Sequence, residues 1–143
     1  MRIGIVGAEG AKFTKEGERA ARVIITSLLE PGDIVVSGGC HLGGIDIWAE
    51  EIAATRGLRS EIFLPAMLSW DEGYKPRNIQ IARGSDYVVC IAVDCLPDGF
   101  AGMRHRLCYH CKATDHIKSG GCWTVKYARK RGIPGEVRIV QNG

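Results

Sequence analysis

Short runs of β-branched and other apolar residues recur along the chain, and a glycine, a proline or a polar turn follows each of them. Short runs that are apolar throughout are typical of strands buried on both faces of a parallel sheet. The run 86–93 is the most apolar and is predicted to be an interior strand. The predicted strands are 2–8, 33–37, 60–64, 86–93 and 136–140.

Between these strands the apolar residues recur every three or four positions, which is the period of an amphipathic helix. One stripe comprises Ala21, Ile24, Ile25, Leu28 and Leu29 and stops at Pro31-Gly32. A second comprises Ile45, Trp48, Ala49, Ile52 and Ala53. Further helices are predicted over 76–84 and 123–131, and a loop is predicted around Trp70 and Tyr74. Alternating strands and helices predict an α/β fold, with a mostly parallel sheet between two layers of helices.

The composition fits one compact unit. The chain has 143 residues, of which 45% are hydrophobic and 24% are charged, and both fractions are ordinary for a globular protein. Because there is no internal repeat or linker, we predict a single domain over 1–143. An irregular stretch rich in Cys and His, at about 103–122, is predicted to be an insertion within it.

Neither a membrane segment nor a secretory signal is expected. No apolar run approaches the roughly 20 residues of a membrane helix. The first residues are predicted to form a strand, and they lack the apolar region of a signal peptide. We therefore expect a cytoplasmic protein without membrane contact, whose six cysteines do not form a disulfide framework.

A glycine-rich loop joins the second predicted strand to its helix. It contains Ser37, Gly38, Gly39 and Gly43. Strand, glycine loop and helix together place backbone N–H groups and a helix N-terminus against a phosphate. A tight turn without a ligand is the alternative, but four glycines within 38–44 exceed what a turn needs.

Other polar candidates follow the ends of the parallel strands, where ligands bind in such sheets. Gly7 and Ala8 end the first strand. Asp46 lies at the start of the second helix, where it can accept a hydrogen bond from a ribose hydroxyl or complement the helix dipole. Arg77 and Asn78 begin the third helix, where they can bind a phosphate or carboxylate and a sugar or base. Surface residues at a helix start are the alternative for this pair.

A second glycine pair, Gly120-Gly121, precedes the last predicted helix and nearly repeats the first loop. Thr124 follows it and can cap the turn or contact a phosphate. We therefore include Gly120, Gly121 and Thr124 among the predicted nucleotide-binding residues.

The spacing Cys108-x2-Cys111-x4-His116-x5-Cys122 is typical of a metal site. Thiolates and imidazole are the usual ligands of tetrahedral zinc, and four protein ligands make a structural site. We therefore predict a structural zinc ion, although His105 and His110 are competing donors. The alternatives are free thiols without a metal and, less favoured, a redox Cys-x-x-Cys.

Positive charge is concentrated in the last third of the chain. The segment 102–132 holds eight Lys or Arg and one acid, a net charge of +7, whereas the whole chain carries +3. This asymmetry suggests a phosphate-bearing partner near the segment, and a solvated basic helix face is the alternative.

Together these motifs resemble the SLOG superfamily, which includes Smf/DprA and Lonely-guy-like proteins. The resemblance rests on Ser37-Gly38-Gly39 with Gly43, Asp46 and Ala49, on Arg77-Asn78 with the strand 86–89, and on Ser119-Gly120-Gly121 with Thr124. The first loop is one residue longer than the superfamily pattern, and the cysteine insertion lies outside it. The resemblance is to an uncharacterised bacterial and phage branch and implies a Rossmann-like nucleotide-binding fold, often dimeric or larger.

The resemblance also bears on activity. Lonely-guy enzymes hydrolyse the N-glycosidic bond of nucleoside monophosphates with an Arg and a Glu, and that Glu follows the second glycine–Thr loop. Here Val125, Lys126, Tyr127 and Ala128 follow Thr124, with no carboxylate. We therefore expect a nucleotide-binding protein with a zinc site. A phosphoribohydrolase is the alternative, and a single-stranded nucleic-acid binder with Tyr109 and Trp123 as stacking surfaces is a second alternative.

Overall fold

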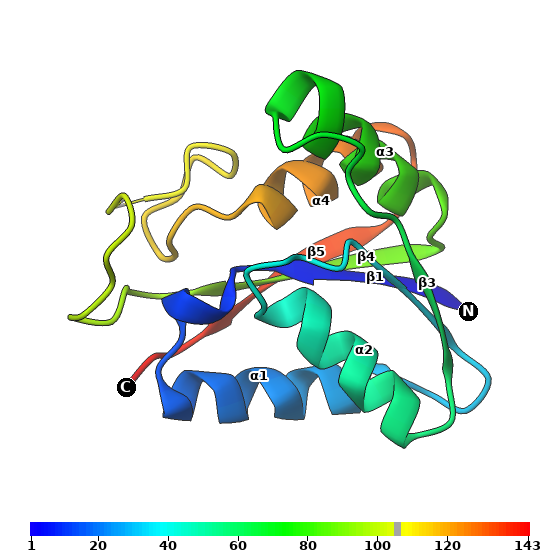
Figure 1. The fold of residues 1–143 in the computed structure, drawn as a ribbon, viewed down its shortest axis with the longest axis horizontal. Helices are drawn as coiled ribbons and strands as arrows, with labels where there is room; N and C mark the ends of the chain where they lie inside the picture. Colours follow the sequence, from blue (N-terminus) through cyan, green and yellow to red (C-terminus); the bar gives the residue numbers. More distant parts are fainter. Residues whose placement is uncertain (105–106) are drawn as a thin grey trace.

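A computed structural model describes residues 1–104 and 107–143. Five parallel strands form one sheet in the order β3-β2-β1-β4-β5 (Figure 1). The strands are β1 (Arg2–Gly7), β2 (Ile34–Ser37), β3 (Arg59–Ile62), β4 (Tyr87–Val93) and β5 (Gly135–Val140). The predicted α/β class with a parallel sheet is confirmed, and so is the interior position of the strand predicted over 86–93.

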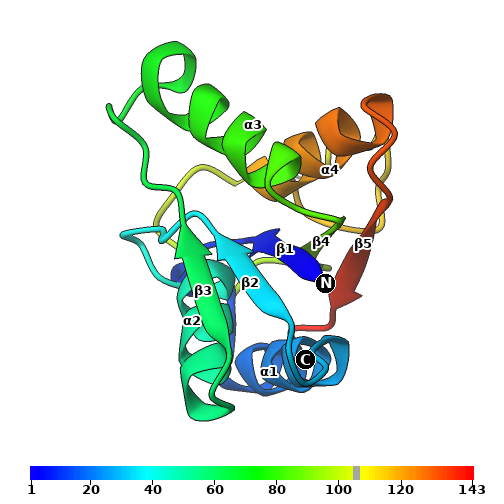
Figure 2. The same cartoon turned by 90° about the vertical axis from the view of Figure 1, so that its right-hand side faces the viewer.

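The helices lie in two layers, one on each face of the sheet (Figures 1 and 2). Helices α1 (Lys15–Leu28) and α2 (Ile45–Thr55) cover one face, and α3 (Lys75–Arg83) and α4 (Gly120–Lys130) cover the other. Alternate residues of the strands supply the two cores. Ile3 and Ile5 of β1 pack with α1 and α2, whereas Val6 packs with α3 and α4.

The order of the strands creates a switch point beside β1. From β1 the chain moves outward to β2 and β3, and then returns to place β4 on the other side of β1. Strand pairing at the end of β1 brings Gly7 level with Ile91 of β4. Connections that leave in opposite directions separate above the carboxyl ends of these strands and leave a crevice, where ligands bind in open parallel sheets.

Two segments differ from the elements predicted from the sequence. Helix α4 begins at Gly120 instead of Trp123, because Ser119 caps it by accepting a hydrogen bond from the Gly121 N–H. The glycine pair therefore forms the first helical turn. The expected loop around Trp70 contains one turn of π-helix, η2 (Trp70–Tyr74), which continues directly into α3. A further short turn, η1 (Gly10–Lys12), connects β1 to α1.

The cysteine-containing segment between β4 and α4 lies beyond the carboxyl end of β4, at the left of Figure 1. It forms no named helix or strand in its described part, and paired backbone hydrogen bonds between Cys108 and Ala113 close a tight turn. His105, named above as a competing metal ligand, lies outside the described residues. None of the described helices is both long and apolar enough to cross a membrane.

Candidate functional site

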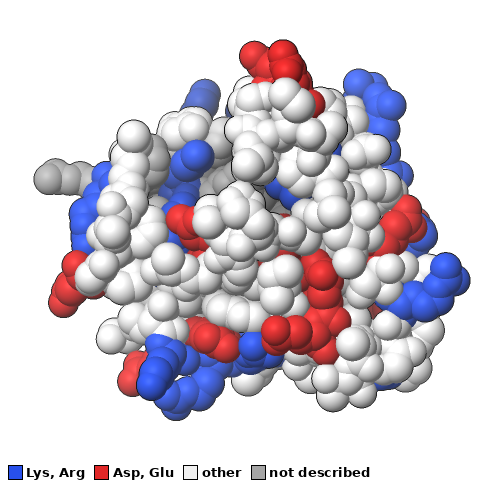
Figure 3. Space-filling model, in the orientation of Figure 1, with Lys and Arg blue, Asp and Glu red and all other residues white. Residues whose placement is uncertain are grey.

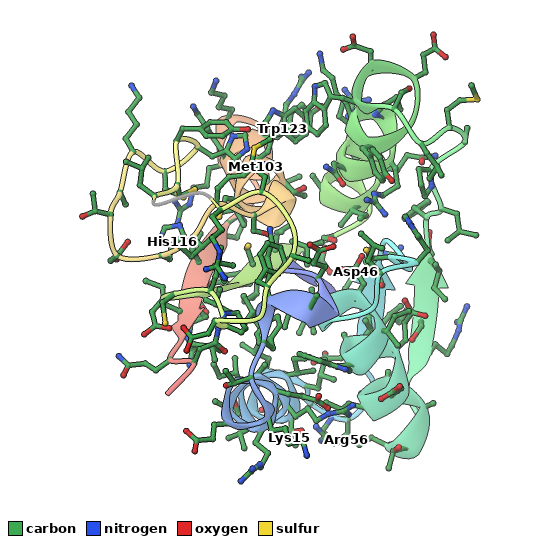
Figure 4. The ribbon with its side chains drawn as sticks, turned by 60° about the vertical axis from the view of Figure 1, so that its left-hand side comes forward. Lys15, Asp46, Arg56, Met103, His116 and Trp123 are labelled. Carbon is green, nitrogen blue, oxygen red and sulfur yellow. The ribbon has the colours of Figure 1, made fainter. Side chains whose placement is uncertain are left out.

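A pocket of about 340 Å³ occupies the switch point between β1 and β4. Figure 4 looks toward the carboxyl ends of the strands, and Asp46 lies near the centre of that view, between α2 and the helices of the other layer. The wall of the pocket comes from the ends of β1 and β2 and from the starts of α2, α3 and α4. The lining residues are Val6, Gly7, Ala8, Glu9, Lys12, Cys40, His41, Leu42, Asp46, Trp70, Tyr74, Arg77, Asn78, Ile81, Lys118, Ser119, Gly120, Gly121 and Thr124.

Arg77 is held rigidly at one side of the pocket and is only 9% exposed. Its Nη1 donates to the Gly38 carbonyl at 2.7 Å, and its Nε donates to Asn78 Oδ1 at 2.9 Å. The guanidinium also lies over the Tyr74 ring, 5.5 Å from the ring centre. These contacts fix the guanidinium before any ligand arrives, so binding costs it little conformational entropy.

Asp46 lies in the first turn of α2 with its carboxylate facing Arg77 and the pocket. It is 6% exposed, and its Oδ2 accepts a hydrogen bond from the Cys40 N–H at 3.2 Å. Burial raises the pKa of Asp46 to about 6, although the positive charge of Arg77 and the Cys40 hydrogen bond oppose the rise. A carboxyl group with this pKa exchanges a proton near neutral pH, which distinguishes it from a surface aspartate at a helix start.

The first glycine loop supports the pocket more than it lines it. Ser37, Gly38, Gly39 and Gly43 are outside the lining set, and residues 40–42 of the same loop take their place. The Ser37 hydroxyl donates to Glu50 at 2.7 Å and accepts from the Gly39 N–H at 3.2 Å. The Gly38 carbonyl is occupied by Arg77. Because these polar groups already form hydrogen bonds within the protein, they are not free to bind a ligand.

Gly44 explains why this loop needs its glycines. It caps α2 with a φ of 87°, in the left-handed region that L side chains rarely adopt. A Cβ there would also lie 2.4 Å from the Ala8 carbonyl oxygen. The loop therefore folds down onto the end of β1, and its tip at 40–42 turns toward the pocket.

The second glycine pair lies directly at the pocket, opposite Asp46. Gly121 approaches β1 so closely that an added Cβ would lie 3.0 Å from the Gly7 backbone nitrogen. Ser119 accepts the Gly121 N–H with its hydroxyl and the Cys122 N–H with its carbonyl, and the positive end of the helix dipole lies at this turn. Thr124 is fully buried, and its Oγ1 lies 3.5 Å from the Gly120 carbonyl.

Two lysines join this side of the pocket. Lys12 Nζ donates to the Lys118 carbonyl at 3.4 Å. Burial lowers the pKa of Lys12, against the opposing charge of Glu9. Within the described part of the chain neither lysine forms an ion pair. Sequence reasoning missed Lys12 because it lies in the short η1 turn; its position just after the first predicted strand was the available signal.

A separate Cys/His cluster lies beside the start of α4. Cys108, Cys111, His116 and Cys122 each place one ligand atom within 4.8 Å of the others, so the cluster can hold a metal ion. His116 Nε2 lies 3.6 Å from Cys122 Sγ. Ligand atoms of tetrahedral zinc lie about 3.5–3.8 Å apart, given bond lengths of about 2.1 and 2.3 Å. The described cluster therefore contains His116, and His110 is not part of it.

The surroundings of the cluster resemble those of a ligand set. His116 Nδ1 lies 2.7 Å from Asp115 Oδ1, which fixes the ring with Nε2 toward the thiol of Cys122. Burial, together with the neighbouring thiol Cys122, raises the pKa of Cys111 to about 12. A hydrogen bond with Cys90, at 3.8 Å, and burial raise that of Cys122. All six cysteines are free thiols.

The cluster and the pocket share one short segment. His116 and Cys122 are both donors of the cluster, and the residues between them include Lys118, Ser119, Gly120 and Gly121 of the pocket wall. The Ile117 N–H also donates to the Val93 carbonyl at 2.8 Å, which ties the segment to the end of β4. A metal ion bound at the cluster would close a loop around this part of the pocket.

Comparison with known proteins gives one informative likeness. No protein-family model matches the chain, and no curated protein matches it in sequence. Among solved structures it is similar to the molybdenum cofactor carrier protein of Chlamydomonas reinhardtii, with a TM-score of 0.60 and 16% identity. The similarity covers 95% of this chain and 74% of that protein. Membership of the SLOG superfamily stays a prediction. At this identity the likeness shows that the two chains share a Rossmann-like α/β fold.

Proposed function

We propose that the pocket between β1 and β4 binds a nucleotide or a nucleotide-derived small molecule, with a phosphate at the start of α4. The observation that carries the proposal is the convergence of Lys12, Lys118 and the Gly120-Gly121 turn on one side of the pocket. A partly buried ammonium group without an ion pair favours an anionic ligand, because the ligand replaces the hydration that the lysine has lost.

The opposite side of the pocket suits the rest of such a ligand. Arg77 and Asn78 offer fixed donors, and Asp46 offers an acceptor for hydroxyl or amino groups. Trp70 and Tyr74 add flat apolar surface for a ring system. The volume, about 340 Å³, lies at the lower end of the range for small-molecule sites.

The structural neighbour supports the same class of function. That protein is a molybdenum cofactor carrier, so a chain of this fold carries a small cofactor. We extend to the present chain only the binding of a small ligand, and the local residues supply the argument for phosphate.

We infer that the metal of the Cys/His cluster is zinc with a structural role. Three thiols and one imidazole are preferred ligands of zinc, and four protein ligands leave no open position for catalysis. The ion would hold the segment 116–122 in place and so stiffen the side of the pocket that receives the phosphate.

Titration with ligands tests the pocket. A panel of nucleoside mono- and diphosphates, with inorganic phosphate as competitor, is followed by tryptophan fluorescence and calorimetry. Lys12→Gln removes one charged contact and is expected to weaken binding by about tenfold or more. Lys15→Gln, an exposed lysine of α1, is the matched control. Equal affinities in the two variants, or no binding by the panel, would contradict the proposed site.

A second candidate function is N-glycosidic hydrolysis, and the position of Asp46 favours it. Glu50 is bonded to Ser37 and Glu51 to Arg22. Of the two acidic residues that line the pocket, Glu9 and Asp46, it is Asp46 that interacts with the charge of Arg77. Such a group can stabilise positive charge at the sugar carbon while water adds there and the base leaves with a proton. Release of free base from nucleoside monophosphates, lost in Asp46→Asn, is the expected result. No release from any of them would exclude this activity.

A further inference from the structure

The outer face of α4, away from the sheet, carries a regular row of aromatic and basic residues. Trp123, Lys126, Tyr127 and Lys130 recur at the spacing that places helix residues on one side. These four side chains line a small hollow of about 120 Å³. Lys126 and Lys130 are exposed, whereas Trp123 and Tyr127 are half-buried. The pocket proposed above does not use any of them.

The aromatic rings form a continuous track. Trp123 and Tyr127 are stacked, with ring centres 5.4 Å apart and an angle of 13° between their planes. Trp70, 42% exposed, meets the Trp123 ring edge to face at 5.1 Å. In Figure 4, Trp123 lies at the outer side of α4, beside the turn that precedes α3. The track thus begins at the mouth of the ligand pocket and runs along α4.

Cations flank this track. The Arg131 guanidinium lies over the Tyr127 ring, 5.3 Å from its centre. Lys126 and Lys130 also border a second hollow of about 410 Å³, which they share with Arg129. Helix α4 contains no acidic residue. Figure 3 shows further Lys and Arg side chains gathered over the neighbouring cysteine-containing segment, at the left of that view.

We propose that this face of α4 binds single-stranded nucleic acid, with bases stacked on Trp70, Trp123 and Tyr127 and phosphates paired with Lys126, Lys130 and Arg131. Stacking rings between cations bind unpaired bases whatever their sequence, because every base has a flat face. A duplex hides those faces and offers only its phosphates. This function goes beyond the small-molecule pocket and shares only Trp70 with it, at the pocket mouth.

Fluorescence anisotropy of a fluorescein-labelled thymidine oligonucleotide of about 15 residues tests the proposal, with a duplex of equal length as comparison. Titrations between about 50 and 200 mM salt give the number of phosphate contacts. The double variant Lys126→Gln/Lys130→Gln is expected to lower the slope of log affinity against log salt by about 1.4, or about 0.7 for each contact. The double variant Lys15→Gln/Arg19→Gln on α1, on the other face of the sheet, is the control.

Two aromatic variants test the stacking. Tyr127→Leu keeps an apolar side chain but removes the ring, and should lower the affinity for the single strand at least about fivefold. Trp123→Phe keeps a ring and should retain most of the affinity. Quenching of tryptophan fluorescence by the single strand is expected as well. The thermal midpoint of every variant is measured and is expected to be unchanged for the exposed Lys126 and Lys130. Because Tyr127 packs against the core, binding of the aromatic variants is compared well below their midpoints.

Several results would overturn this inference. They are an undetectable affinity at low salt, equal binding of the duplex, and equal losses in the α4 and α1 double variants. Loss of oligonucleotide binding in Lys12→Gln would also overturn it, because the strand would then enter the small-molecule pocket. Unchanged oligonucleotide binding in Lys12→Gln supports a separate surface, even if no nucleotide binds the pocket itself.

Discussion

Gly120 and Gly121 are neighbours in the first turn of α4, yet a methyl group would meet different surroundings at each. At Gly121 an added Cβ would lie 2.7 Å from Cys90 Sγ and 3.0 Å from the Gly7 backbone nitrogen. At Gly120 it would meet nothing within 4 Å. Alanine favours a helix over glycine by about 1 kcal/mol, whereas overpacking costs about 1–3 kcal/mol. We expect Gly120→Ala to stabilise the fold by about 0.5–1 kcal/mol and Gly121→Ala to destabilise it by about 1–2 kcal/mol.

Urea and thermal unfolding, followed by circular dichroism, measure this difference, and about 1 kcal/mol moves the midpoint by roughly 3–4 °C in a chain of this size. Ligand titration of the same variants adds a second readout. Gly120→Ala should weaken binding despite its greater stability, because Gly120 lines the pocket and its methyl group would narrow the space for the ligand. A midpoint for Gly121→Ala equal to or above that of Gly120→Ala would refute the close approach of α4 to β1.

Three further predictions concern Asp46, the Cys/His cluster and Lys112. Because burial raises the pKa of Asp46 from 3.8 to about 6, its contribution to stability is fully present below pH 4 and is lost as pH rises through 6. The free energy of unfolding of Asp46→Asn, relative to wild type, should therefore rise by up to about 3 kcal/mol between pH 4 and pH 7, and a pH-independent difference would contradict the raised pKa. Removal of the metal with a chelator should increase hydrogen exchange at residues 116–122 and weaken ligand binding while the sheet amides stay protected; unchanged exchange there would show that no metal holds the segment. Lys112 has a φ of 53° directly after Cys111, so Lys112→Gly should stabilise the metal-loaded protein by about 1 kcal/mol, measured by thermal unfolding, and a loss of stability would show that the turn does not strain this residue.

The sequence predicted the layers of the fold because its periodicity is a property of local segments. The apolar run 86–93 and the stripe at 21–29 are strong signals, and each became the expected element. Strand ends also share one rim in any parallel sheet, so Gly7, Asp46 and Gly121 were expected to meet, and all three line the pocket.

The direction in which a loop turns was not predictable in the same way. Ser37, Gly38 and Gly39 have the composition of a phosphate cradle, but Glu50 and Arg77 occupy two of their polar groups. Those partners are 13 and 39 positions away in the sequence, and only the packing of α2 and α3 brings them close. Trp70 was not predicted to line the pocket either, since the π-helical turn η2 that places it there was not predictable from local sequence.

The choice between His110 and His116 as metal ligand also required tertiary structure. Both residues lie close to Cys111 in the sequence, so spacing alone permits either. The paired hydrogen bonds between Cys108 and Ala113 close the turn, and Asp115 orients the His116 ring toward the thiols. His110 instead lines the hollow beside Lys126. A hydrogen-bond partner one residue away favours His116 over His110, which the cysteine spacing alone did not.

The Cys/His cluster and the pocket are not independent, because the chain between His116 and Cys122 belongs to both. A ligand phosphate at Gly120-Gly121 would order the same backbone that an ion orders by binding its two flanking donors, so whichever binds first removes part of the entropy cost of the second. The coupling must then be reciprocal: if the ion raises ligand affinity by some factor, the ligand raises ion affinity by that same factor. Chelator competition in the presence and absence of saturating ligand measures that factor directly. A factor of one would mean that the strand ends and the Ser119 cap already hold the segment rigid, and that the cluster stabilises the insertion alone.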